Sequence, residues 1–444
     1  MDLRQAGSKE MVLQVPERLV FANNPVIFFH WPRTTLRHKD IPMISACIIG
    51  ISGFGRTHYN DLIAETEAGR MKPVAATIIN QDEERERTEH LRSLGCEVFT
   101  DYREMLSVWS GRAELCFIPT GIYLHAPMSI AAMNAGMNVF VEKPAAGSIQ
   151  DVRAMQKAER ETGRFVAVGY QTMYATETMR MKEAIVSGAL GEIITVKCLG
   201  LWPRMDKYYA RNRWAGALTC DGAWVLDSPF NNALAHQLNM ICFLAGTELR
   251  KSAQIASVEA ELHHGHNIES ADTAAIRATT ATGAKLLFLV THCSSESFGP
   301  EIVVRGTEGS IRWDFSTTTI TSGDNRETFE TEPVDNVRTR IMQRLRERIA
   351  DPDTFTCDLN IAGTQTLVVN GAHESSPVRD IPAGFITRTP ADDDVKTVIT
   401  GIDKAMHQAF EQEKLFSELD VPWAVPGQTV DMTAYTSFEG GASS

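Results

Sequence analysis

A glycine-rich turn near residue 50 has the residue types and spacing of a phosphate-binding loop. It reads Gly50-Ile51-Ser52-Gly53-Phe54-Gly55, between an apolar run at 44–49 and a helical pattern that continues to about Ala68. Glycines let the backbone turn tightly and approach a pyrophosphate, and the N-terminus of the following helix offers free N–H donors. The spacing is a permuted form of the usual dinucleotide fingerprint, so the flanking strand and helix carry the prediction. We expect Gly50, Ser52, Gly53, Phe54 and Gly55 to bind a dinucleotide.

The end of the next apolar run is where a dinucleotide-binding domain reads the adenosine ribose. The run at 74–79 is followed by Asn80, which can bond a ribose hydroxyl without repelling a 2′-phosphate. Arg85 and Arg87 lie one helical turn further on, and they either face a 2′-phosphate or pair with neighbouring glutamates on a solvated helix face. We expect Asn80 to contact the cofactor, and the choice between NAD and NADP stays open.

A segment rich in aromatic residues and arginines has groups that bind sugars. It reads Tyr208-Tyr209-Ala210-Arg211-Asn212-Arg213-Trp214. Aromatic faces stack on the C–H surfaces of sugar rings, and arginine forks bond hydroxyls or carboxylates. We expect Tyr209, Arg211 and Trp214 to contact a substrate, with a dimer-contact loop as the equal alternative.

Three histidines lie close together in His263-His264-Gly265-His266. Adjacent residues of a strand point to opposite faces, and no carboxylate or thiolate spacing accompanies these histidines. We therefore expect a solvated loop and no metal site. His292 and His373 follow apolar runs, and nothing in the sequence decides whether they face a site.

The elements that position the glycine turn follow a regular alternation from residue 44 to 168. Short apolar runs alternate with helical patterns, several of which stop at a glycine such as Gly69, Gly95 or Gly163. Strands that alternate with helices form βαβ units and a parallel sheet. The sequence predicts an α/β, doubly wound domain over 43–168.

After about residue 175 the pattern changes. Strand-like runs between 253 and 313 follow one another without intervening helices, which predicts antiparallel pairing in a second, α+β domain over 169–415. Residues 336–349 and 392–413 look helical, and 416–444 look like an irregular tail. Residues 1–42 have no helical or strand period. We interpret them as an appended arm or as residues assigned before the true start of the protein.

Composition narrows the classes of partner. The 444 residues include 43 lysines and arginines and 56 acidic residues, for a net charge of −13. Such a surface repels phosphate backbones and anionic lipid, so we expect no nucleic-acid or membrane partner, and any phosphate must be held locally. Eight well-separated cysteines and the lack of a long apolar run or a secretory signal predict a cytoplasmic protein.

Several ordered motifs together resemble the Gfo/Idh/MocA oxidoreductase family, which includes glucose–fructose oxidoreductase and inositol dehydrogenase. The motifs are the Gly50–Gly55 turn, Phe140-Val141-Glu142-Lys143-Pro144, Ile118-Pro119-Thr120 with His125, Ala135-Gly136, Gly169-Tyr170-Gln171 and Ser187-Gly188-Ala189-Leu190-Gly191-Glu192-Ile193. The match is good over about 44–250, weaker to about 380, and absent from 1–42 and the last thirty residues.

The resemblance implies a Rossmann domain, then an α+β domain with a large open, mostly antiparallel sheet, and NAD or NADP bound between them. The implied chemistry is hydride transfer at a secondary alcohol or carbonyl carbon of a sugar, sugar acid or cyclitol. Lys143 would bond the reacting hydroxyl, and Pro144 would fix its turn through a cis bond. Near a cationic nicotinamide its pKa should fall, which makes it a plausible base. Thr120, His125, Glu142 and Lys143 would also line the cofactor, and Tyr170 the substrate.

The family's second catalytic element is an aspartate followed four residues later by a histidine. One register places Asn232 and His236 at these positions, on one face of a helix, and replaces the aspartate by asparagine. The other uses Asp227 and lacks the histidine. We favour the first and expect Asp227 close by. The lost carboxylate leaves a cofactor-binding regulator or sensor without turnover as the alternative to a dehydrogenase. A reductase or lyase acting on a non-sugar carbonyl would differ only in its substrate site.

The open second sheet would expose an apolar face to water if nothing covered that face. We therefore expect this sheet to pack face to face against another copy of the chain, in a homodimer or homotetramer.

Overall fold

The computed structural model describes residues 41–441. The predicted arm at 1–42 therefore lies almost entirely outside the described residues.

The first sheet carries the glycine turn. Within the described residues it has six parallel strands in the order β3-β2-β1-β4-β5-β6. Their bounds are β1 (Ile44–Ile49), β2 (Met71–Thr77), β3 (Glu97–Phe99), β4 (Leu115–Ile118), β5 (Asn138–Val141) and β6 (Val166–Val168). The order reverses beside β1, which pairs with both β2 and β4, and dinucleotides bind at such a switch point. The prediction of an α/β Rossmann fold is confirmed.

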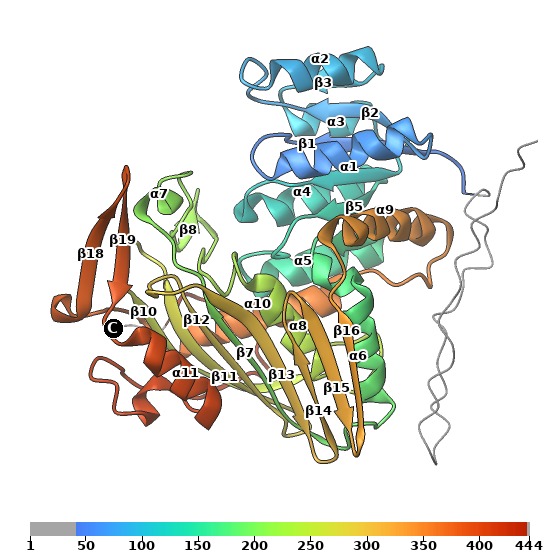
Figure 1. The fold of residues 1–444 in the computed structure, drawn as a ribbon. Helices are drawn as coiled ribbons and strands as arrows, with labels where there is room; N and C mark the ends of the chain where they lie inside the picture. The colour runs from blue at the N-terminus through green and yellow to red at the C-terminus, as the bar shows by residue number, and fades with distance from the viewer. Residues whose placement is uncertain (1–40, 442–444) are drawn as a thin grey trace, which may run out of the picture. The chain divides into compact units, whose positions relative to one another are not determined.

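Helices connect these strands at the predicted places (Figure 1). They are α1 (Gly55–Glu67), α2 (Arg85–Ser93), α3 (Tyr102–Val108), α4 (Ile122–Asn134) and α5 (Ile149–Thr162). Ser148 caps α5 by accepting a hydrogen bond from the Asp151 amide. Gly163 ends this helix in the left-handed conformation, as the sequence predicts. Central strands such as β4 and β5 are buried along their whole length, as strands of a covered parallel sheet are.

The second sheet is larger and mixed. Its described strands follow the order β16-β15-β14-β13-β7-β12-β11-β10-β17, with β20 also paired to β10. The bounds are β7 (Ile193–Leu201), β10 (Ile255–His264), β11 (Thr273–Thr280), β12 (Lys285–Thr291), β13 (Phe298–Gly306), β14 (Gly309–Trp313), β15 (Thr317–Ser322), β16 (Asn325–Glu330), β17 (Val378–Asp380) and β20 (Val430–Asp431). Most neighbours are antiparallel, whereas β7–β12 and β10–β17 are parallel. The predicted large, mostly antiparallel sheet is confirmed.

Helices α6 (Thr176–Val186), α8 (Ala235–Leu244) and α10 (Leu359–Ser375) pack on one face of this sheet. The helix predicted at 336–349 is α9 (Val334–Ala350), which contacts α1. The helix predicted over 392–413 is wrong in its first half. A hairpin of β18 (Ile386–Ala391) and β19 (Asp394–Ile399) precedes the shorter helix α11 (Ile402–Gln412).

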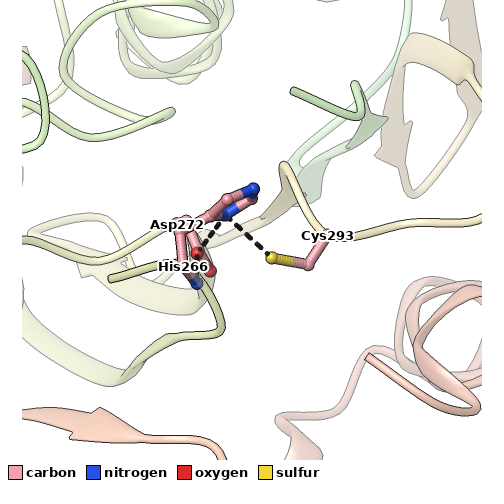
Figure 2. A group of neighbouring side chains, drawn as sticks. All are labelled: His266, Asp272 and Cys293. Carbon is pink, nitrogen blue, oxygen red and sulfur yellow. Dashed lines mark hydrogen bonds and ion pairs between the residues drawn. The ribbon is translucent and has the colours of Figure 1, made fainter. Parts of the chain in front are cut away.

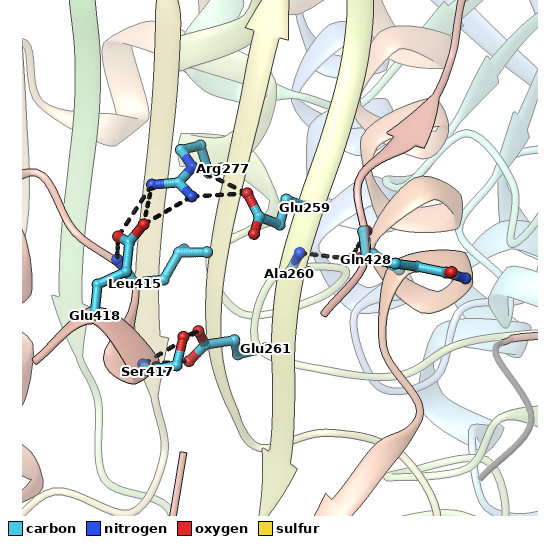
Figure 3. A network of polar contacts seen from close by, with 9 residues as sticks. Glu259, Ala260, Glu261, Arg277, Leu415, Ser417, Glu418 and Gln428 are labelled. Carbon is cyan, nitrogen blue, oxygen red and sulfur yellow. Dashed lines mark hydrogen bonds and ion pairs between the residues drawn. The ribbon is translucent and has the colours of Figure 1, made fainter. Parts of the chain in front are cut away.

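The opposite face of the sheet is partly covered by the chain itself. Apolar residues of β7 and β12 form one buried cluster with Met406 and Phe410 of α11 and with Phe416. Figure 3 shows how the 3₁₀ turn η4 (Phe416–Glu418) is tied to the sheet, since Arg277 bonds both Glu259 and Glu418. The predicted homo-oligomer depended on an uncovered face, and it stays a prediction.

The last described residues also meet the body of the protein. Phe438 is buried, and its ring lies 4.8 Å from that of Trp224. None of the helices in the described range is both long and apolar enough to cross a membrane.

Candidate active site

The glycine turn leaves space and free donors where a pyrophosphate would bind. Gly50 and Gly53 have φ angles of +90° and +55°, which L side chains rarely adopt. A Cβ added at Gly55 would lie 2.9 Å from the Gly50 carbonyl oxygen, so only glycine lets α1 start this close to β1. Within the described residues the amides of Ser52, Gly53 and Phe54 donate no hydrogen bond. These donors at a helix N-terminus fit a dinucleotide phosphate.

Asn80 lies beside the turn, and its contact with the cofactor stays a prediction. The Ser52 hydroxyl donates to Asn80 Oδ1 at 3.1 Å, and the Asn80 amide donates to Glu83 Oε2 at 2.8 Å. Arg87 pairs with the buried Glu84 at 2.7 Å, and the exposed Arg85 lies 3.9 Å from Asp82. The arginines thus have acidic partners on their own segment, and the choice between NAD and NADP stays open.

The segment after β5 places Lys143 at the same carboxyl edge of the sheet as the glycine turn. The Lys143–Pro144 peptide is cis, as expected. Buried Glu142 accepts from His58 Nε2 at 2.8 Å and from the Lys143 amide at 3.0 Å. Although burial alone raises it, these bonds and nearby positive charges bring the pKa of Glu142 down to about 2. Glu142 therefore stays ionised behind Lys143.

His125 holds this segment from the other side. Its Nδ1 lies 2.8 Å from the Pro144 carbonyl oxygen and its Nε2 lies 3.1 Å from that of Thr120. His125 is buried, and burial lowers its pKa. A Cβ at Gly50 would lie 3.8 Å from Thr120 Cγ2, so Thr120 borders the turn. Of the residues predicted to line the cofactor, Thr120 lies at the turn, whereas His125 and Glu142 support Lys143.

Asn232 and Asp227, the two candidates for the family's aspartate position, are connected to Lys143 by hydrogen bonds. Lys143 Nζ donates to Asn232 Oδ1 at 2.7 Å and to its carbonyl oxygen at 3.0 Å. The Asn232 amide donates in turn to Asp227 Oδ1 at 2.7 Å. The predicted helix begins only at Ala235, so Asn232 lies in the turn that precedes it. Asn232 thus contacts the lysine, and Asp227 supplies a carboxylate one step further away.

Arg211 extends this chain of contacts. Its Nη2 lies 3.3 Å from Asp227 Oδ2, which also accepts from the Gly216 amide at 2.7 Å. Burial raises the pKa of Asp227, and Arg211 opposes that change. Burial lowers the pKa of Lys143, while Glu142 and Asp227 oppose that change. The lysine is therefore easier to deprotonate than one in water.

His236 lies in the first turn of α8, near Lys143. Burial and then the charge of Lys143 lower its pKa to about 3, so the ring is neutral at neutral pH. Its Nδ1 is buried and has no partner among the described residues. The ring of Tyr170 meets it edge-on, with centroids 5.7 Å apart, and the buried Tyr170 hydroxyl donates to Gln365. Tyr170, predicted to contact substrate, thus packs behind His236.

The aromatic and arginine segment gathers around a short helix, α7 (Asp206–Tyr209). The Arg211 guanidinium lies 3.8 Å from the Tyr208 ring centroid and 5.5 Å from that of Trp214. The Tyr209 hydroxyl lies 2.9 Å from Nδ1 of the buried His292. Arg211 thus links this segment to Asp227. Tyr208, which contacts Arg211, was not among the predicted substrate contacts, and the sequence left the position of His292 open.

The prediction of a solvated histidine loop is wrong. His263 and His266 are buried, because His263 packs on Trp423 and His266 joins a polar cluster with Asp272 and Cys293. His266 Nδ1 lies 2.7 Å from Asp272 Oδ2 and 3.3 Å from Cys293 Sγ, and Figure 2 shows these three side chains side by side. These nitrogen, oxygen and sulfur atoms are metal-ligand types.

However, Asp272 Oδ2 already accepts from His266 and from the backbone amides of Gly265 and His266, both at 2.9 Å. Its hydrogen bonds, chiefly with His266, outweigh burial and lower the pKa of Asp272 to about 2. We interpret the cluster as a hydrogen-bonded support for the strands that carry it.

Two family models match successive regions of the chain. Residues 44–170 match the NAD-binding Rossmann fold of the Gfo/Idh/MocA oxidoreductases, and residues 178–312 match their C-terminal domain. The chain belongs to the Gfo/Idh/MocA family. The cofactor class is therefore a nicotinamide dinucleotide, and the glycine turn lies within the region matched by the NAD-binding model.

Curated Gfo/Idh/MocA relatives include inositol dehydrogenases. An inositol 2-dehydrogenase/D-chiro-inositol 3-dehydrogenase of Halalkalibacterium halodurans is 25% identical over 202 residues, 45% of this chain and 52% of that protein. An inositol 2-dehydrogenase of Rubrobacter xylanophilus is 32% identical over 153 residues, 34% of this chain and 42% of that protein. The chain thus spans about half the length of the curated relatives it matches.

Solved structures of similar fold cover more of the chain. The WlbA dehydrogenase from Bordetella pertussis, in complex with NADH and UDP-GlcNAcA, aligns with a TM-score of 0.61 and 21% identity over 74% of this chain and 95% of that one. A levoglucosan dehydrogenase in complex with NADH and levoglucosan aligns with a TM-score of 0.62 and 17% identity over the same shares. At these identities the likeness shows the fold.

Proposed function

We propose that the chain is an NAD(P)-dependent oxidoreductase that transfers hydride between the nicotinamide and a secondary alcohol or carbonyl carbon of a sugar, sugar acid or cyclitol. The hydrogen bonds from Lys143 to Asn232 and from Asn232 to Asp227 carry this proposal, since Lys143 follows β5 in the sheet whose strand β1 precedes the glycine turn. The curated relatives, which include inositol dehydrogenases, support the substrate class.

The nicotinamide supplies hydride chemistry when bound. Side chains of the protein would transfer the proton. In the oxidation direction, the Lys143 amine accepts the proton from the substrate hydroxyl. Burial favours the neutral amine that this step needs, and Asn232 orients it through its side-chain and backbone oxygens. A neutral His236 can exchange a hydrogen bond with the same hydroxyl. We propose that Tyr209, Arg211 and Trp214 contact the rest of the substrate.

A regulator without turnover is not favoured. The sequence favoured it only through the carboxylate lost at position 232, and Asp227 lies one hydrogen bond further from Lys143. Asp227 is buried and can still stabilise a protonated lysine after proton transfer.

A screen of cyclitols, aldoses and sugar acids with NAD and NADP tests the proposed reaction. We expect reduced nicotinamide to form with at least one member of the panel. Tight cofactor binding without turnover on the whole panel would favour the regulator. A homo-oligomer stays a prediction, which sedimentation measurements can test.

Replacing Asn232 with aspartate is expected to shift the pH dependence of alcohol oxidation to higher pH. The new carboxylate lies beside Lys143 and favours its charged form, so deprotonation needs a pH higher by about 1–3 units. Repulsion from Asp227 opposes ionisation of the new carboxyl group, whereas the Lys143 ammonium beside it favours ionisation. The measurement is the acid limb of kcat against pH. An unshifted limb, with cofactor affinity preserved, would show that Lys143 is not the titrating base.

A further inference from the structure

The β18–β19 hairpin lies beyond residue 312, where the family models end. Its base is attached to the ends of two strands of the large sheet. The Ile399 amide donates to the Cys293 carbonyl oxygen at 2.9 Å, and Arg388 donates to the Gly265 carbonyl oxygen at 3.1 Å. The hairpin is thus fixed to the sheet next to the buried His266 cluster.

Strand β19 of the hairpin also contacts the short helix α7 (Figure 1). Met205, just before α7, forms a backbone bridge with Lys396 of β19. Within α7, the Lys207 amide donates to Asp394 Oδ1 at 3.1 Å. Met205 supplies no side-chain cap, so Asp394 satisfies one of the free N–H groups at the start of this helix. The Lys207 ammonium also pairs with Asp393, but both groups are largely exposed.

The position of α7 decides where the proposed substrate-binding side chains lie. Tyr209 is the last residue of α7, and its ring also lies 4.8 Å from that of His266. Arg211 follows two residues later and contacts Asp227, which leads to Lys143 through Asn232. A four-residue helix has little stability of its own, so its position depends on contacts such as those with β19.

We propose that the β18–β19 hairpin positions the substrate-binding segment, and that Asp394 is the positioning residue that holds α7. The proposal rests on the proposed function, because it assigns the substrate to Tyr209 and Arg211. Since the hairpin contacts α7 and not the glycine turn, it affects recognition of the sugar, sugar acid or cyclitol and leaves cofactor binding alone.

The test compares Asp394→Ala with Asp394→Asn and Asp393→Ala. Asp394→Ala is expected to raise the KM for the polyol substrate about fivefold, the factor that loss of one helix cap allows, with kcat and NADH affinity unchanged. Asp394→Asn keeps the accepting oxygen and is expected to behave like the parent protein. Asp393→Ala removes only an exposed ion pair, so it is the matched control and should change nothing.

Hydrogen exchange of the amides around α7 gives a readout that needs no substrate. We expect Asp394→Ala alone of the three variants to speed this exchange. Unchanged exchange and KM, or equal effects of Asp393→Ala, would overturn the positioning role. Faster exchange with an unchanged KM, when Arg211→Met also leaves KM unchanged, would instead overturn the substrate site of the proposed function.

Discussion

Replacing Lys143 with methionine is expected to lower kcat by about 10²–10⁴-fold, the usual contribution of a positioned acid or base. Methionine keeps a similar apolar stem but cannot take a proton. The Lys143 ammonium donates two hydrogen bonds to Asn232. The substitution removes these two bonds from Asn232, whereas the glycine turn keeps its structure. NADH affinity, measured by fluorescence titration, should therefore stay close to that of the parent protein.

Lys157 provides a matched control for this substitution. It is an exposed lysine of α5 whose ammonium lies 3.7 Å from Glu161, and it is not one of the contacts described for Lys143. Lys157→Met should leave both kcat and NADH affinity unchanged. If Lys143→Met turned over like the parent protein, the proton would leave the substrate by another route, and the assignment of the base would be wrong.

Replacing Gly55 with alanine is expected to weaken NADH binding by about 5- to 150-fold, because an overpacked contact typically costs about 1–3 kcal/mol. The new Cβ would lie 2.9 Å from the Gly50 carbonyl oxygen and 3.5 Å from the Pro119 ring. A backbone oxygen cannot move aside as a side chain can. The start of α1 must shift, and the free amides at Ser52, Gly53 and Phe54 shift with it.

Gly384→Ala is the matched control, because nothing lies within 4 Å of a Cβ added there and its backbone conformation suits alanine. It should leave NADH affinity unchanged. An NADH affinity in Gly55→Ala equal to that in Gly384→Ala would contradict the placement of the pyrophosphate at this turn.

The parts of the fold that depend on local signals could be predicted from the sequence. A few neighbouring residues are enough to predict the glycine turn, the strand–helix alternation and the helix stops at Gly69 and Gly163. The structure confirms these structural features. Lys143 was found in the same way, from the motif around it. What these residues bind stays a proposal.

The contacts between distant segments could not be predicted. The choice between Asp227 and Asn232 was posed as an alternative, yet a turn before α8 brings both side chains into one chain of hydrogen bonds. The His266 cluster joins residues 27 positions apart, so no local spacing revealed that these side chains are buried.

The hairpin at 386–399 was missed for a different reason. Its turn is a run of aspartates, and Asp392 has a φ of +51°, a conformation typical of tight hairpin turns. Charged residues in a row resemble a helix surface in sequence. In the structure they form the turn that reaches the proposed substrate segment, so the missed element is the one that we propose shapes recognition.

Transfer of deuterium from substrate carbon to cofactor tests the central claim most directly. Panel substrates carrying deuterium on their ring carbons are incubated with the protein and NAD or NADP, and the reduced nicotinamide is analysed by NMR. We predict that deuterium appears on the nicotinamide ring with the parent protein and at a rate lower by about 10²–10⁴-fold with Lys143→Met. A cofactor that binds tightly but acquires no deuterium from the panel would contradict the proposed hydride transfer.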